Sequence, residues 1–114
     1  MLSTKEVMRF LTEKYNLEID QSLLFKYAKK GLVTKEQKIG QGYKKGIQTF
    51  WENSAVGKVY IIKALLKQNF KLAEISKYHQ MSKQEYLILD ELELAKYNRV
   101  TKYFSEAESK ISIG

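Results

Sequence analysis

The chain has 114 residues, of which 44% are hydrophobic, and this is enough for a small fold around a modest core. Its 20 Lys and Arg residues against 13 Asp and Glu residues give a net charge of +7, which suits a nucleic-acid binder but also occurs in many other proteins. Cysteine is absent, so disulfides and thiolate metal sites are excluded, and no apolar run approaches membrane-spanning length. We expect a soluble, cytoplasmic protein with no membrane partner.

The first predicted element is a helix from about Ser3 to Tyr15. Ser3 and Glu6 have the spacing of a capping box, in which each side chain bonds the backbone N–H of the other residue. Val7, Phe10 and Leu11 share one face at helical spacing, so this face is predicted to pack on the core.

A second, shorter helix is predicted to begin at Asp20 or Gln21. It runs through Leu23, Leu24, Tyr27 and Ala28, and Gly31 follows as the residue that ends the helix in the left-handed region. Two helices joined by a short break predict a helix-turn-helix.

A glycine-rich hairpin is predicted next. Residues 32–33 lead into a strand, residues 40–46 contain three glycines that permit a tight turn, and Ile47–Trp51 return as the second strand. The adjacent Lys44 and Lys45 lie where such a loop reaches a phosphate backbone.

Positive charge gathers over the second helix and this hairpin. Residues 26–45 hold seven lysines against the single acid Glu36, a net charge of +6, which leaves +1 for the remainder of the chain. Charge concentrated in this way is typical of an electrostatic footprint for nucleic acid, and a solvated lysine-rich face is the plainer alternative.

Two further helices are predicted before residue 80. Asn53 or Ser54 caps the first, whose apolar residues between positions 56 and 66 cover a surface too broad for a helix buried on one side. Asn69 and Phe70 interrupt it, and a short helix over residues 72–78 closes the head.

The last predicted element is one long helix from Ser82 to about Lys110, because Ser82 and Glu85 repeat the capping-box spacing and no glycine or proline interrupts the chain between Glu85 and Lys110. A helix of this length spans roughly 40 Å and needs a partner along its apolar stripe. A second copy is the expected partner, and folding back onto the head is the alternative. The predicted dimerisation residues are Tyr86, Leu89, Tyr97, Val100, Phe104, Ala107 and Ile111.

Catalysis and metal binding have little support in the sequence. His79 is the only histidine and lacks a partner at ligand spacing, so we expect a surface or capping residue. The carboxylates are scattered along helices without a pocket signature. The chain is therefore predicted not to be an enzyme, with no catalytic residue, no metal site and no cofactor.

The order of these pieces resembles the DNA-binding domain of the MerR family of winged helix-turn-helix regulators, over residues 3 to about 110. The family's second helix reads approximately V-s-x-x-T-L-R-Y-Y-e-x-x-G-L, its wing carries G-Y-R, and a later element reads G-F-s-L-x-x-I. The corresponding residues here are Ile19, Leu24, Tyr27, Gly31 and Leu32 in the second helix, Gly42-Tyr43-Lys44 in the wing, the aromatic Trp51, and Asn69-Phe70-Lys71-Leu72-Ala73-Glu74-Ile75.

The sequence also departs from the family pattern. Phe25 stands where the family has arginine in its second helix, and Lys26 stands where it has the first tyrosine. The contacts that the family makes through these two positions are therefore not carried over. No cysteine and no ligand domain follows the last helix, so no small-molecule effector is evident.

The resemblance implies a mainly α-helical fold, with a winged helix-turn-helix head that has a short two-stranded wing over residues 1–80. A long C-terminal dimerisation helix follows over residues 81–114. The implied partner is double-stranded DNA, bound as a homodimer on an inverted-repeat operator, with the second helix in the major groove and the wing against the backbone.

Candidate contacts follow from exposure and charge. The candidates near base edges are Gln21, Ser22 and Lys26, at the exposed N-terminal part of the second helix. Phe25 is either a contact to a thymine methyl group or a core residue, and Lys5 and Arg9 are further candidates on the first helix. The phosphate candidates are Lys29, Lys30, Lys38, Tyr43, Lys44 and Lys45.

Two other functions stay open beside a transcriptional regulator. One is an architectural, excision or plasmid and phage maintenance factor of a mobile element, which bends DNA without reading an operator. The other is a protein-interaction module that uses the C-terminal helix. A regulator shows salt dependence and sequence preference, an architectural protein chiefly the first, and an interaction module neither.

Overall fold

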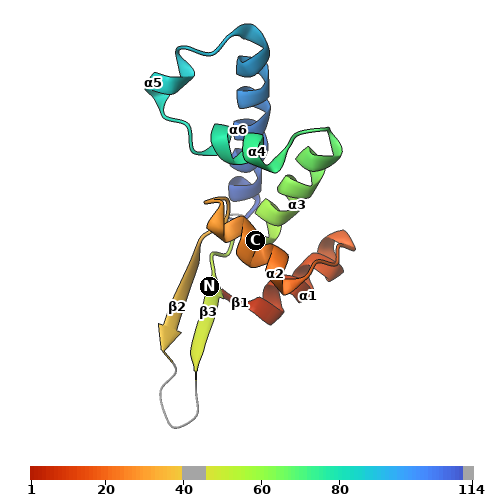
Figure 1. The fold of residues 1–114 in the computed structure, drawn as a ribbon. Helices are drawn as coiled ribbons and strands as arrows, with labels where there is room; N and C mark the ends of the chain where they lie inside the picture. Colours follow the sequence, from red (N-terminus) through yellow and green to blue (C-terminus); the bar gives the residue numbers. More distant parts are fainter. Residues whose placement is uncertain (40–45, 112–114) are drawn as a thin grey trace. The chain divides into compact units, whose positions relative to one another are not determined.

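The chain is mainly helical and divides into two compact units, residues 1–56 and 57–114 (Figure 1). The fold is that of a computed structural model, which describes residues 1–39 and 46–111. This division falls earlier in the chain than the boundary expected at residue 80. The first unit contains β1 (Leu2–Ser3), α1 (Thr4–Tyr15), α2 (Gln21–Lys29), β2 (Lys35–Ile39), β3 (Ile47–Trp51) and the start of α3 (Ala55–Lys67).

The predicted capping box opens α1. The Glu6 N–H donates to Ser3 Oγ at 3.1 Å, and the Ser3 N–H donates to Glu6 Oε1 at 3.0 Å. These bonds lower the pKa of the Glu6 carboxyl, chiefly through the backbone N–H of Ser3. Val7 and Leu11 are fully buried, as their spacing predicted.

Helix α2 also has its predicted bounds. It begins at Gln21, buries Leu24 and Tyr27, and ends before Gly31, whose φ of 77° lies in the left-handed region. The N–H of Leu32 then donates to the Tyr27 carbonyl at 3.0 Å, the bond that closes a Schellman-type helix end.

A three-stranded antiparallel sheet completes the first unit, in the order β1-β3-β2. Lys35 pairs with Trp51 at one end of the β2–β3 ladder, and Leu2 pairs with Trp51 from the other side. The hairpin strands were predicted, whereas β1 was not, because two residues carry no detectable alternation. Trp51 is fully buried, and its Nε1–H donates to Thr4 Oγ1 at 2.9 Å, which ties the sheet to α1.

The second unit contains most of α3, α4 (Leu72–His79), α5 (Lys83–Tyr86) and α6 (Glu91–Ile111). Asn69 ends α3 with a φ of 71°, at the position where a break was predicted. A Cβ built at Gly57 would lie 3.4 Å from the Ala107 Cβ, so α3 and α6 approach closely at this point. The core of this unit consists of Val59, Ile62, Leu65, Phe70, Ile75, Tyr78, Val100, Phe104 and Ala107.

The prediction of one helix from Ser82 to Lys110 was wrong. The chain forms the short α5, leaves helical geometry after Tyr86, and begins α6 at Glu91. A new cap causes the second start, because the Glu93 N–H donates to Asp90 Oδ1 at 2.8 Å. The capping box predicted at Ser82 and Glu85 is present.

Much of the predicted dimerisation stripe is buried inside the chain itself. Val100, Phe104 and Ala107 are at most 4% exposed in the folded chain. The prediction that these three side chains are exposed for pairing with a second copy was therefore wrong. Their burial agrees with the alternative, in which this part of α6 folds back onto the chain. Tyr86, Leu89 and Tyr97 are half-buried, and the side chain of Ile111 lies outside the described part of the chain.

Contacts between α4 and α6 explain this burial. His79, expected as a surface or capping residue, is the half-buried last residue of α4, and its ring stacks on Phe104 with a centroid distance of 4.2 Å. Lys96 Nζ lies 3.1 Å from the Glu74 carboxylate. The pKa of Glu74 is lowered, first by the backbone N–H of Lys71 and then by Lys96.

Candidate nucleic-acid interface

Helix α2 presents an exposed and mainly polar face, which includes the half-buried Phe25, opposite the side that buries Leu24 and Tyr27. At about 100° per residue, Gln21, Ser22 and Lys26 fall within one arc of the helix, and Leu24 and Tyr27 fall on the other side. The three polar side chains are exposed, and both apolar ones are buried. The structure therefore brings the predicted base-edge residues onto one accessible surface.

Two lysines extend this face toward the C-terminus of α2. Lys29 and Lys30 are both exposed, and Lys29 falls within the same arc as Gln21 and Ser22. Among the described residues, neither Lys26 nor Lys29 is engaged in an ion pair with a carboxylate. The charges of Lys26 and Lys29 are thus available to an anionic partner.

Phe25 anchors α2 to the sheet. Its ring meets the fully buried Trp51 edge-on, with a centroid distance of 5.3 Å and an interplanar angle of 74°. Of the two roles that the sequence left open for Phe25, this contact supports packing. An aromatic contact of this kind holds the polar face of α2 in a fixed orientation relative to the hairpin strands.

Lys35 is a member of the basic cluster that the sequence did not select as a contact. Its Nζ lies 5.7 Å from the centroid of the Phe25 ring, in a cation–π contact between β2 and α2. The ammonium group is therefore close to the polar face of α2. Its position within the lysine-rich segment 26–45 was the signal that would have found it.

The hairpin tip is outside the described part of the chain. This applies to the predicted contacts Tyr43, Lys44 and Lys45. Lys38 belongs to β2, and its side chain is likewise not described. The adjoining strands are paired up to Ile39 and Ile47, so the described ladder leads directly into residues 40–46 (Figure 1).

The two candidates on α1 differ in their surroundings. Lys5 is exposed, whereas Arg9 lies 3.8 Å from Glu13 in an exposed ion pair one helical turn away. The Arg9 guanidinium also lies 5.0 Å from the centroid of the Phe10 ring. Arg9 is therefore partly neutralised, and Lys5 is the freer charge of the two.

Within residues 1–39 and 46–111, no group of three or more His, Asp or Glu side chains is placed to hold a metal ion. None of the helices in the same part of the chain has both the length and the apolar character needed to cross a membrane.

Comparison with protein-family models, curated proteins and solved structures finds no match to this chain.

Proposed function

We propose that the chain is a sequence-specific double-stranded DNA-binding protein whose first unit is a winged helix-turn-helix. In this proposal α2 enters the major groove, where Gln21, Ser22 and Lys26 meet base edges, and Lys29 and Lys30 meet phosphates. The hairpin of β2 and β3 is the wing, and residues 40–46 lie against the flanking backbone.

One observation carries this proposal above the others. The exposed side of α2 bears Gln21, Ser22, Lys26 and Lys29, while the opposite side is fixed to the core through Leu24 and Tyr27. A polar and cationic helix face on a rigid support is what reading a groove requires. The resemblance to MerR-family regulators supports the same assignment of helix and wing.

The burial of Val100, Phe104 and Ala107 bears on the number of copies that bind. If two copies occupy an inverted repeat, they meet through a surface other than these three side chains. The homodimer therefore stays a prediction, which the arrangement of the selected DNA sites tests directly.

Selection of bound duplexes from a random library by the full chain tests the proposal. We expect enrichment of a defined site and an affinity that falls steeply as the salt concentration rises. An inverted repeat indicates two copies, and a single half-site indicates one. Steep salt dependence without enrichment favours the architectural role instead, and no binding at low salt contradicts a DNA-binding function.

A variant of α2 makes this test specific to the proposed site. The side chain of Gln21 is exposed, so Gln21→Ala should leave folding intact. The substitution should nevertheless change the bases selected at one or two positions of the site. Gln84→Ala, at an exposed position in α5 of the second unit, is the matched control and should select the same site as the parent chain. Identical selected sites for all three proteins would remove α2 from the major groove.

A further inference from the structure

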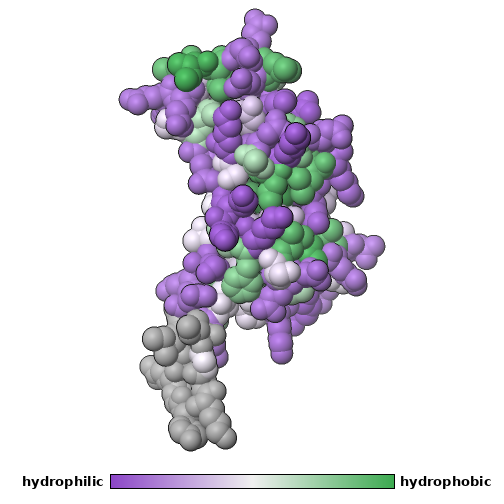
Figure 2. Space-filling view, viewed as in Figure 1, coloured by the Kyte–Doolittle hydropathy of each residue, from purple (hydrophilic) through white to green (hydrophobic). Residues whose placement is uncertain are grey.

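Three large aliphatic side chains are exposed where α5 leads into α6, two on the link and one in the first turn of α6. Leu87, Ile88 and Leu92 are 76%, 85% and 70% exposed, and we call them the aliphatic ridge. Figure 2 shows hydrophobic residues gathered where this part of the second unit lies. Single exposed leucines are ordinary, but three on one short segment mark an interaction surface.

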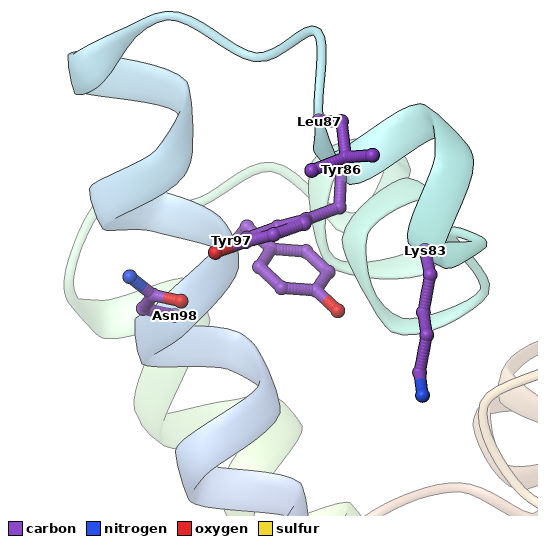
Figure 3. Close-up of a pocket in the computed structure, with 5 residues that line it drawn as sticks. All are labelled: Lys83, Tyr86, Leu87, Tyr97 and Asn98. Atoms are coloured by element: carbon purple, nitrogen blue, oxygen red, sulfur yellow. The ribbon is translucent and has the colours of Figure 1, made fainter.

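A pocket with aromatic walls, which we call the tyrosine pocket, adjoins the ridge. It has a volume of about 450 Å³ and is lined by Lys83, Tyr86, Leu87, Tyr97 and Asn98. The Tyr86 and Tyr97 rings lie 5.0 Å apart between α5 and α6, and the Lys83 side chain extends away from them (Figure 3). Because Leu87 belongs to both features, an apolar side chain in this pocket would lie directly against the ridge.

Carboxylates border the ridge, in contrast to the positive charge of the whole chain. Glu85, Asp90 and Glu91 are exposed, and we call them the acidic rim. Glu93 is already paired with Lys77 at 3.9 Å. Lys83 offsets one of the three rim charges, so this end of the second unit is net negative while the chain carries +7.

These features do not suit a second copy of the same surface. In a symmetric dimer the same patch meets itself, so the two acidic rims would face each other and repel. Three aliphatic side chains also expose only a few hundred square ångströms, whereas a stable interface buries about 800 Å² per partner. A short segment of another protein requires far less area.

We propose that the aliphatic ridge and the tyrosine pocket bind a basic amphipathic segment of a partner protein. An apolar side chain of that segment fills the pocket, its neighbours at helical spacing cover the ridge, and its Lys or Arg residues meet the acidic rim. This function is separate from DNA binding, because it uses residues of the second unit only.

The test uses the full chain and two synthetic, fluorescently labelled helical peptides. One has leucines and a tryptophan on one face and lysines on the other, and its counterpart has glutamate in place of every lysine. We expect the lysine peptide to bind at least ten times more tightly than the glutamate peptide, as measured by fluorescence anisotropy. Added salt should weaken the binding of the lysine peptide.

Two sets of variants locate the binding. The triple substitution Leu87→Ser, Ile88→Ser, Leu92→Ser should lower the affinity for the lysine peptide at least tenfold, and its unfolding should match the parent chain because the three side chains are exposed. Glu91→Lys should also weaken binding. Glu106→Lys has the same charge change at another exposed position of α6 and is the matched control.

Two results would overturn the proposal. Equal binding of the lysine peptide to the parent chain and the triple variant would place the peptide elsewhere. A concentration-dependent dimer in sedimentation that the triple substitution disperses would make a second copy the occupant of the ridge. Loss of DNA binding would affect neither readout, because the peptide is measured without DNA.

Discussion

Tyr27 is a buried residue of the first unit whose hydroxyl group reduces the stability of the fold. Its side chain is 1% exposed, and its hydroxyl has no hydrogen-bond partner among the described residues. A buried hydroxyl that has lost water and gained no partner lowers the free energy of unfolding by about 1–3 kcal/mol. The ring nevertheless belongs to the buried side of α2 together with Leu24.

Tyr27→Phe should therefore be neutral or stabilising. We expect the free energy of unfolding to rise by up to about 1 kcal/mol, because the variant keeps the ring and removes the unpaired hydroxyl. Urea denaturation followed by circular dichroism measures the change. Tyr86→Phe, at a half-buried position, is the control and should have little effect. A loss of more than about 1 kcal/mol for Tyr27→Phe would mean that the hydroxyl has a stabilising partner.

The same hydroxyl predicts a pH dependence. Burial raises the pKa of the Tyr27 phenol above its ordinary value of 10.0. The folded chain therefore keeps this proton at pH values where the unfolded chain has released it, so the contribution of Tyr27 to stability is complete below pH 10 and is lost as the pH rises further. Between about pH 9 and pH 11, Tyr27→Phe should lose less stability than the parent chain, and parallel unfolding curves would contradict the burial of the neutral phenol.

For single residues, the sequence predicted which side chains face outward or inward better than it predicted which residues they contact. Period and capping placed Gln21 and Lys26 outward and Leu24 inward, because both rules act within one helical turn. The contact of Phe25 with Trp51 joins residues far apart in the chain, and no local pattern specifies it. For the same reason Lys35 was not selected, although its charge was counted.

Among the elements, α3 and α6 show how a glycine sets the distance between two helices. A Cβ at Gly57 would lie 3.4 Å from the Ala107 Cβ and 3.6 Å from the Ala107 carbonyl oxygen, which is ordinary contact. A methyl group therefore fits, but a longer side chain has no space. Small residues on both helices are the condition for this packing.

Two substitutions at Gly57 should have opposite effects. Gly57→Ala should raise the free energy of unfolding by up to about 1 kcal/mol, because alanine favours the helix. Gly57→Leu should lower it by about 1–3 kcal/mol, because the side chain forces α3 and α6 apart. Chemical denaturation measures both. Gly46→Leu is the matched control, since a Cβ there meets nothing within 4 Å. Equal losses for the two leucine variants would disprove the close approach.

The elements that were predicted correctly are those with a local start or stop signal. The capping boxes at Ser3 and Ser82 and the break at Asn69 are examples. The interruption before α6 was missed because Asp90 ends one helix-compatible stretch and caps the next without a glycine or proline. The strand β1 was missed because it exists only through its pairing with β3.

For the molecule as a whole, charge is distributed unevenly along the chain. Residues 26–45 carry +6 of the total of +7, and the acidic rim of the second unit is net negative together with Lys83. The sequence predicted the basic cluster, because counting needs no fold. It left open whether the apolar stripe of the last helix is covered by the chain itself, as Val100 and Phe104 are, since such a stripe looks the same whichever surface covers it.

DNA binding should depend on where charge is removed and not only on how much. Lys29→Ala with Lys30→Ala should weaken binding to every duplex and lower the slope of log affinity against log salt by about 2, at roughly 0.9 per phosphate contact. Lys67→Ala with Lys102→Ala removes the same charge from exposed positions of the second unit and should leave the slope unchanged. The slopes are measured by anisotropy titration. Equal slopes for the two double variants would mean that DNA binding depends on the net positive charge of the chain and not on the lysines at the C-terminal end of α2.

The left-handed residues Asn16 and Asn69 have a consequence for how this sequence can change over evolutionary time. Both end a helix with a positive φ, 51° and 71°, and neither is a glycine. At such positions selection acts on the backbone conformation and accepts glycine, asparagine and aspartate far more readily than β-branched residues. Divergent descendants of this chain should therefore alternate among these few residue types at positions 16 and 69, even where every neighbouring side chain has been replaced.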